Sequence, residues 1–301
     1  MHRRFRFPRP RSGTASLLAN GVRPRAIAAG PAPGNAVRVA LRTPPAWDEL
    51  LGDLAGIGPV WRITRNRHAS LGLREDGGYP RLHFSPNGLL AVDAAGSLAA
   101  DFSAWGRAWA VEATPPCGHR VHAAEFEDAR GDVFHKVCLS GNVPPARFAA
   151  WARAWQADGI AEVPCAAAPR EPGPVPPGTL HLAGALLRDI VLSAAEAGIA
   201  LRAAVHADGL SQRGEIRPAQ ATESGGWLRL LGDGAALFVE AEPDGLLRVE
   251  PQPVEGEAGW SVALVHPDGR RWLELAAGPD DLRAWNRLVS DRLLRGPGIG
   301  R

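Results

Sequence analysis

Apolar residues recur at helical spacing in several segments of the chain. In residues 47–54 they lie three and four positions apart, and Gly56 and Gly58 follow, which favours a short helix that ends at the glycines. The same spacing predicts helices over residues 145–156 and 186–197. Each predicted helix has one apolar face, which must pack against other elements.

Between the first two of these helices the pattern changes to that of strands. Short alternating or apolar segments at residues 60–64, 82–84, 89–92 and 109–112 are separated by turn residues and predict strands. Residues 126–139 predict a hairpin with its turn near the middle. The first half therefore has the order helix, several antiparallel strands, helix.

The same order returns in the second half of the chain. Residues 225–230 repeat the pattern of residues 77–82, and residues 281–285 repeat that of residues 146–151. The interval between the repeated segments is much longer than a solenoid repeat of ~20–50 residues. It fits two diverged copies of one unit better. We predict an α+β protein made of two tandem copies of an antiparallel-sheet-plus-helices unit, related by pseudo-twofold symmetry.

Proline marks the boundary between the copies. Six prolines fall within residues 163–178, a density that is incompatible with a helix and typical of an extended linker. We therefore predict a first repeat over residues 46–162, a Pro-rich linker over 163–179 and a second repeat over 180–295. Residues 1–45 contain many arginines and no acidic residue, so we expect a disordered basic tail there.

Composition and charge exclude several classes of protein. The 301 residues carry 34 basic and 32 acidic side chains, a formal net charge of +2, which gives no indication of nucleic-acid binding. No run of ~18 uncharged apolar residues is present, so we expect no membrane insertion. The three cysteines form no C-x-x-C pair, which argues against a disulfide framework or a zinc site and favours a reducing cytoplasm.

Three short segments of the first copy share the order of a known set of motifs. Residues 131–139 read Gly-Asp-Val-Phe-His-Lys-Val-Cys-Leu, residues 65–66 read Arg-Asn, and residues 102–111 begin Phe-Ser-Ala-Trp and end in valine. In this order they resemble the HemS/HmuS family of bacterial haem-utilisation proteins, whose chains contain two such repeats. The resemblance extends from about Trp47 to Leu293 and identifies the chain as a diverged member.

The resemblance implies a fold, a cofactor and a cellular setting. The implied fold is a pair of large antiparallel sheets flanked by helices, with b-type haem held non-covalently in a cleft between the sheets. Its setting is the bacterial cytoplasm, where a haem importer and haem oxygenase proteins are the expected partners. Such a site needs an apolar slot, cations for the propionates and an axial donor for the iron.

The resemblance also points to individual residues. It places the axial ligand at His181, at the start of a helical stretch between the copies, although Ala183 stands where the family has an aromatic residue. An exposed histidine at a helix start is the alternative interpretation. The family's two arginine positions fall on Ala99 and Ala104, so Arg107 is the candidate that replaces them, unless it is a solvated surface charge.

Four further residues are candidates for the haem pocket. His135 and Lys136 are adjacent on the best-matched strand, so only one of them can face the cleft. They would offer a second iron site or a cation for a propionate; alternatively, His135 is hydrogen-bonded to a neighbour within the sheet. Trp105 and Trp109 are the expected cleft tryptophans, and we expect no metal beyond haem iron.

We expect a cytoplasmic haem-binding protein that receives haem and passes it on. One alternative is an enzyme that degrades haem and releases its iron. The other is a degenerate relative that kept the two-lobed scaffold, lost the pocket and serves as a protein-interaction scaffold. The alanines at positions 99 and 104 favour this last alternative.

Overall fold

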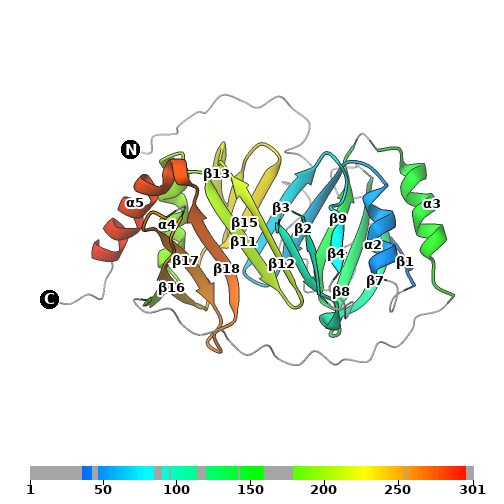
Figure 1. Ribbon diagram of the computed structural model, residues 1–301, viewed down its shortest axis with the longest axis horizontal. Helices are drawn as coiled ribbons and strands as arrows, with labels where there is room; N and C mark the ends of the chain where they lie inside the picture. The colour runs from blue at the N-terminus through cyan, green and yellow to red at the C-terminus, as the bar shows by residue number, and fades with distance from the viewer. Residues whose placement is uncertain are drawn as a thin grey trace.

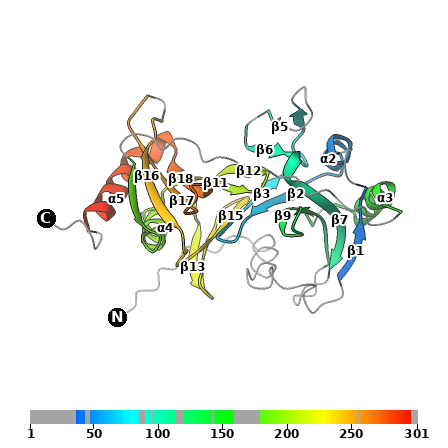
Figure 2. The same cartoon turned by 90° about the horizontal axis from the view of Figure 1, so that it is seen from below.

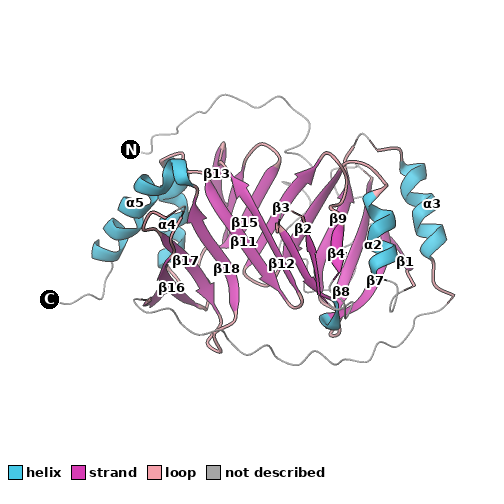
Figure 3. Cartoon of the chain, viewed as in Figure 1, coloured by secondary structure: helices cyan, strands magenta, loops and turns pink. Residues whose placement is uncertain are grey.

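Two nine-stranded antiparallel sheets form the body of the protein in this computed structural model, and helices flank them at both ends (Figures 1 and 3). The structure describes residues 36–42, 47–84, 90–94, 96–113, 120–141, 143–158, 179–254 and 256–295.

The first half of the chain contributes strands and two helices in the predicted order. These elements are β1 (Ala36–Ala40), α2 (Trp47–Ala55), β2 (Val60–Arg65), β3 (Ala69–Glu75), β4 (Leu82–Phe84), β5 (Leu90–Asp93), β6 (Leu98–Asp101), β7 (Trp105–Ala113), β8 (Val121–Asp128), β9 (Val133–Leu139) and α3 (Pro145–Trp155). The short 3₁₀ turn η2 (Phe102–Ala104) joins β6 to β7.

The second half repeats this series. Its elements are β10 (Leu180–Ala183), α4 (Leu186–Glu196), β11 (Leu201–Ala207), β12 (Leu210–Ile216), β13 (Gln220–Ser224), β14 (Trp227–Leu231), β15 (Ala235–Glu240), β16 (Leu246–Pro251), β17 (Trp260–Val265), β18 (Arg271–Ala277) and α5 (Leu282–Arg295). A 3₁₀ turn, η3 (Pro279–Asp281), precedes α5.

The two halves exchange strands. The first sheet has the order β1-β7-β8-β9-β2-β3-β15-β14-β13, and the second has the order β10-β16-β17-β18-β11-β12-β6-β5-β4. Since β10 to β18 repeat β1 to β9, the two orders are the same, with the meanders β4–β6 and β13–β15 traded between the sheets. This arrangement confirms the predicted α+β fold with pseudo-twofold symmetry and adds an interleaving that the sequence did not indicate.

Each end of the molecule has its own hydrophobic core. The first core lies under α2 and α3, where the apolar face of α2 buries Trp47, Leu50 and Leu54 against β7–β9 and the β4–β6 meander. The second core lies under α4 and α5 and includes Leu187 and Trp285. Figure 2 shows the two sheets passing each other in the middle, with one helix pair beside each.

The predicted hairpin over residues 126–139 is present as β8 and β9. Its turn contains Gly131 at φ 89°, a backbone conformation that favours glycine. Asp128 stabilises the turn, because its carboxylate accepts hydrogen bonds from the N–H groups of Arg130 and Asp132 at 2.8 and 2.9 Å.

The expected tail is corrected at its end. Residues 36–40, which we assigned to a disordered segment, form β1 and pair with β7 along its length, from Ala36 opposite Ala113 to Ala40 opposite Trp109. The other residues of that tail, except 41 and 42, and nearly all of the Pro-rich linker lie outside the described residues. None of the helices in the described ranges is long and apolar enough to cross a membrane.

Candidate functional site

The second sheet has one face in the second core and one face directed away from it. Along β16, β17 and β18 every second residue belongs to the second core, for example Leu247, Val262 and Leu273. Since successive strand residues point to opposite faces, the residues between them project to the other side. We call this side the outer face of the second sheet.

One cross-strand row of the outer face contains a histidine and two arginines. Residues directly opposite one another in antiparallel strands share a face, so the pairing registers define the row. The row runs from β10 to β12 and consists of His181, Arg248, Ala263, Glu274, Ala204 and Arg213. At ~4.8 Å per strand the row extends about 24 Å across the sheet.

Small residues form the middle of this face. Ala204, Ser261, Ala263 and Ala276 lie on β11, β17 and β18, and all four are buried. Arg271 forms ion pairs with Glu250 and Glu274 and so joins the strands on either side of β17 on this face.

The charged residues of the outer face differ in whether they are paired. Arg271 donates to Glu250 Oε2 at 2.5 Å and to Glu274 Oε2 at 2.9 Å, so its charge is neutralised within the sheet. Arg248 and Arg213 form no ion pair with any residue that the structure describes. These two guanidinium groups are available for an anionic ligand.

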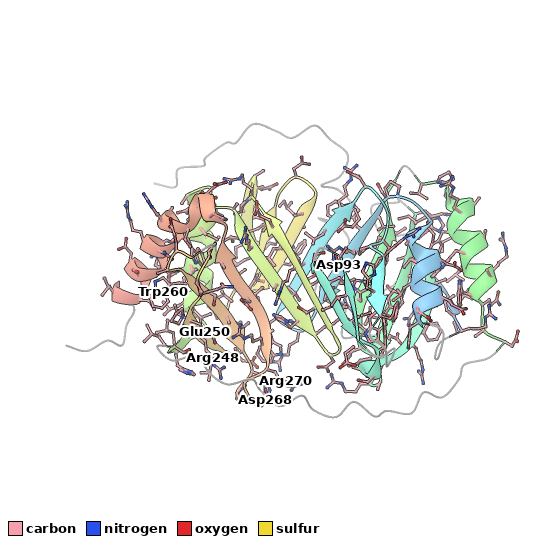
Figure 4. All side chains as sticks on the ribbon, viewed as in Figure 1. Asp93, Arg248, Glu250, Trp260, Asp268 and Arg270 are labelled. Atoms are coloured by element: carbon pink, nitrogen blue, oxygen red, sulfur yellow. The ribbon has the colours of Figure 1, made fainter. Side chains whose placement is uncertain are left out.

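Two buried atoms on β16 lack a hydrogen-bond partner. They are Arg248 Nε, a donor, and Glu250 Oε1, an acceptor. Figure 4 places the two residues close together on this strand. Buried polar atoms are nearly always hydrogen-bonded, so these two atoms are exceptions on this face. The imidazole of His181 and the guanidinium of Arg248 fit haem, which needs an axial nitrogen and cations for its propionates.

His181 lies in a different element from the one expected. It is exposed on β10, an edge strand, and not at the start of a helix, because residues 180–183 pair with β16 and α4 begins only at Leu186. Arg248 is its direct cross-strand neighbour.

His135 and Trp105 are buried in the first core, which corrects their assignment to a haem cleft. His135 Nδ1 lies 2.9 Å from Thr64 Oγ1, and its Nε2 lies 3.2 Å from the hydroxyl of Tyr79. Burial lowers the pKa of His135 to about 3, helped by the charge of Arg62. Trp105 is 2% exposed, and its indole N–H donates to the carbonyl of Gly209 at 3.3 Å.

Lys136, Arg107 and Trp109 lie on the first sheet, away from His181. Lys136 Nζ forms an ion pair with Glu125 at 2.9 Å. Burial lowers the pKa of Lys136, but the charges of Cys138 and Glu125 outweigh it, so the net change is upward. Arg107 lies opposite Glu127.

The ring of Trp109 also has a partner on the first sheet. The guanidinium of Arg38 lies 4.6 Å from its centroid, a cation–π contact. The structure therefore does not bring the predicted pocket residues together around His181.

The two alanines at the family's arginine positions differ in their surroundings. Ala99 lies on β6 opposite Ser211, on the outer face of the second sheet, since Leu98 and Ala100 on either side belong to the first core. Ala104 is buried at the corner after β6, and a Cβ at Gly209 would lie only 2.6 Å from its methyl group. An arginine at position 104 has no space in this corner.

The expected cleft between the lobes is filled. Where the sheets face each other, their side chains pack into the two cores. A half-open pocket of about 320 Å³ lies between α2 and β4, lined by Asp48, Leu51 and Phe84 among others. The described ranges also contain no cluster of His, Cys, Asp and Glu that could hold a metal ion.

Arg213, Arg248 and Glu250 were missed by the sequence analysis. A signal was present in residues 246–251, Leu-Leu-Arg-Val-Glu-Pro, where charged residues alternate with apolar ones. Such alternation predicts a strand with one charged face. It does not say which other strands add to that face, because the pairing joins distant parts of the chain.

Comparisons with known proteins agree with this fold. Residues 24–157 match the family model described as the haemin-degrading HemS.ChuX domain. Holo-PhuS, a heme-binding protein from Pseudomonas aeruginosa, is similar in structure with a TM-score of 0.68 at 18% identity, over 83% of this chain and 86% of that chain. The heme degrading enzyme ChuS of Escherichia coli O157:H7 has a TM-score of 0.68 at 16% identity, over 84% and 86%. No curated protein matches the chain in sequence.

Proposed function

This chain belongs to the HemS family, and from that premise we propose that it binds haem on the outer face of its second sheet. The observation that carries the proposal is the cross-strand row that sets His181 beside the unpaired Arg248. The haem is cargo, received and passed on by a cytoplasmic haem-utilisation protein.

Two neighbours in the row, His181 and Arg248, have distinct tasks in this proposal. The imidazole of His181 donates its lone pair to the haem iron. Arg248 binds a propionate, because its guanidinium is unpaired and next to His181.

Arg213 supplies the second unpaired cation. Its strand neighbour Ser211 lies opposite Ala99, so Arg213 stands diagonally across from the position where the family has an arginine. We propose that Arg213 replaces that arginine in attracting the anionic ligand. The loss of arginines at 99 and 104 therefore does not abolish binding.

Titration with haemin tests the proposal. We expect a saturable Soret shift for the full chain and a loss of affinity of tenfold or more for His181→Ala, because the iron loses its axial nitrogen. His83→Ala is the matched control, since His83 is an exposed histidine on β4, the opposite edge strand of the same sheet. The control variant should bind haemin like the unchanged protein.

The outcomes separate the two parts of the proposal. If the unchanged protein gives no saturable Soret shift, haem binding itself is wrong and the scaffold alternative stands. If haemin binds equally well to His181→Ala and His83→Ala, haem binding remains and the ligand assignment is wrong.

A further inference from the structure

The pocket between α2 and β4 is half-open and has apolar side chains in its lining. Leu51 and Gly52 line it from the helix, and Leu82 and Phe84 line it from β4, the last strand of the second sheet. Figure 1 shows α2 beside this strand. At about 320 Å³ the pocket is at the lower end of the range of small-ligand sites, which is enough for one aromatic side chain.

Two charged side chains at this pocket lack a partner. Asp48, in the first turn of α2, and Arg81, directly before β4, are exposed, and neither forms an ion pair or a side-chain hydrogen bond with any residue that the structure describes. Elsewhere in the protein, three exposed arginines lie over aromatic rings in cation–π contacts: Arg38 over Trp109, Arg42 over Trp155 and Arg67 over Trp272. The pocket therefore suits an aromatic ring next to Arg81, accompanied by a cation next to Asp48.

The N-terminal part of the chain contains both groups. Phe5 and Phe7 are the only Phe, Trp or Tyr residues outside the described ranges. They alternate with arginine in the segment Arg4-Phe5-Arg6-Phe7, which we call the Arg-Phe segment. Residues 1–35 contain seven arginines and no acidic residue, so this part of the chain is strongly basic.

We propose that the Arg-Phe segment docks in the pocket between α2 and β4 of its own chain. One phenyl ring lies against Leu51 and Phe84 and contacts the guanidinium of Arg81. The arginines of the segment face α2, whose charged residues are Asp48, Glu49 and Asp53, all acidic. The segment is then an intramolecular ligand of the first half of the molecule.

The connection to the described fold is long enough for this contact. Residues 8–35 join the Arg-Phe segment to β1, and at ~3.3 Å per residue they span at most about 90 Å. Figures 1 and 2 show β1 at the same end of the molecule as α2, and Leu41, directly after β1, belongs to the same core as Leu51. Because the segment is tethered, its effective concentration at the pocket is high, and a few contacts suffice to hold it.

Limited proteolysis of the full chain with trypsin tests the proposal. Trypsin cleaves after Arg4 and Arg6 in the segment and after Arg25 outside it. Gly52→Leu fills the pocket and retains the helix, because a Cβ at Gly52 meets no atom within 4 Å and leucine has a higher helix propensity than glycine. We expect cleavage after Arg4 and Arg6 to become about tenfold faster relative to cleavage after Arg25, because proteolysis follows the population of the undocked segment.

Gly52→Ala is the matched control for this measurement. It shares the gain in helix propensity but adds only a methyl group, so it should change the cleavage ratio less than about twofold. An unchanged ratio in Gly52→Leu, or equal increases in both variants, would overturn the proposal.

Photo-cross-linking gives a second measurement that does not depend on the protease. With p-benzoylphenylalanine in place of Phe7 in the full chain, we expect cross-links within one chain to residues 47–55 and 81–84. Gly52→Leu should lower their yield about tenfold and Gly52→Ala less than about twofold, in line with the change in occupancy. Cross-links to other parts of the fold would overturn the docking site, and cross-links between two chains would show that a second copy supplies the segment and overturn the intramolecular contact.

Discussion

The two cores of this protein occupy equivalent places in the duplicated fold and have different chemistry. In the first sheet, neighbouring strands β9, β2 and β3 carry His135, Thr64 and Leu71 side by side. The equivalent row on β18, β11 and β12 consists of Leu273, Val205 and Gln212. Each residue holds the same place in its strand as its counterpart, the third in four strands and the fifth in β2 and β11.

Strand exchange places the polar residues of these rows together. Gln212 reaches across from the second sheet to Thr64, whose hydroxyl donates to Gln212 Oε1 at 2.9 Å. The amide nitrogen of Gln212 donates to the carbonyl of Leu71 at 2.8 Å, which fixes the orientation of the amide. Thr64, His135 and Gln212 thus belong to one network, and Val205, Leu273 and Leu71 are their apolar counterparts in the second core.

This network determines the tautomer of His135. The only hydroxyl hydrogen of Thr64 goes to Gln212, so His135 Nδ1 must carry the hydrogen that is shared with Thr64. His135 Nε2 is then an acceptor, and the hydroxyl of Tyr79 donates to it. Burial raises the pKa of Tyr79, so this hydroxyl keeps its proton.

The first core also contains a buried charge. Arg62 is 3% exposed and donates to Glu75 at 2.6 Å and to the hydroxyl of Ser97 at 2.8 Å. Ser97 in turn donates to Asp93, which belongs with it to the exchanged meander of the second sheet. The counterpart of Arg62 is Ala203, which makes no such contact.

The difference shows that a buried side-chain network crosses one junction of the sheets, whereas the equivalent core residues at the other are apolar and the amide of Asn66 donates across it to main-chain carbonyls of β11 and β18. Polar networks specify one arrangement when every member is satisfied and destabilise the fold when one member is removed. A single substitution in the first core should therefore lower the free energy of unfolding more than the equivalent substitution in the second core.

Removal of Arg62 should have the largest effect. Arg62→Met keeps much of the apolar stem but leaves Glu75 and Ser97 without their buried donor, so we expect the free energy of unfolding to fall by about 3 kcal/mol. Urea denaturation followed by tryptophan fluorescence measures this change. Arg202→Met, the neighbouring exposed arginine in the equivalent strand β11, should change it by less than about 0.5 kcal/mol.

Equal effects of the two arginine substitutions would contradict the distinction between the cores. In that case the buried contacts of Arg62 would add nothing beyond those of a surface side chain. A loss confined to Arg62→Met would support a buried charge network on the first side only.

The sequence predicted the elements of both cores but not their difference. Helical spacing located α2, α3 and α4, and the turn around Gly131 located the β8–β9 hairpin, because these signals are local. His135 was expected at a ligand cleft. Adjacent strand residues point to opposite faces, so one of His135 and Lys136 had to face the cleft. Strand exchange decides which residues surround His135, and no local pattern encodes that pairing.

The candidate site was predictable to the same extent. The resemblance located His181, but its neighbour Arg248 comes from a strand more than sixty residues away in the sequence. Ala99 and Arg213 meet through the exchanged meander. The residue types were visible in the sequence, whereas the shared face depends on registers between distant strands.

Conversion of the first core to the chemistry of the second tests the comparison directly. His135→Leu alone should lower the free energy of unfolding by about 2 kcal/mol, because Tyr79 loses a buried partner. The apolar variant Thr64→Val/Tyr79→Phe/His135→Leu/Gln212→Leu removes every side chain of the network and should recover at least about 1 kcal/mol of that loss. Chemical denaturation of both variants gives the two values, and additive losses would show that the network has no cooperative character.

The smallest expected difference between the cores is in how the free energy of unfolding depends on pH. The pKa of His135 is lowered from 6.5 to about 3 in the folded protein, so the unfolded chain takes up a proton at a pH where the folded protein cannot. The stability that His135 contributes is therefore complete above pH 6.5 and is lost as the pH falls toward 3. Between pH 5.5 and 4.5 this loss is about 1.3 kcal/mol. The apolar variant lacks His135, so its stability relative to the unchanged protein should rise by that amount over the same interval, whereas a constant difference would mean that His135 is protonated in both states.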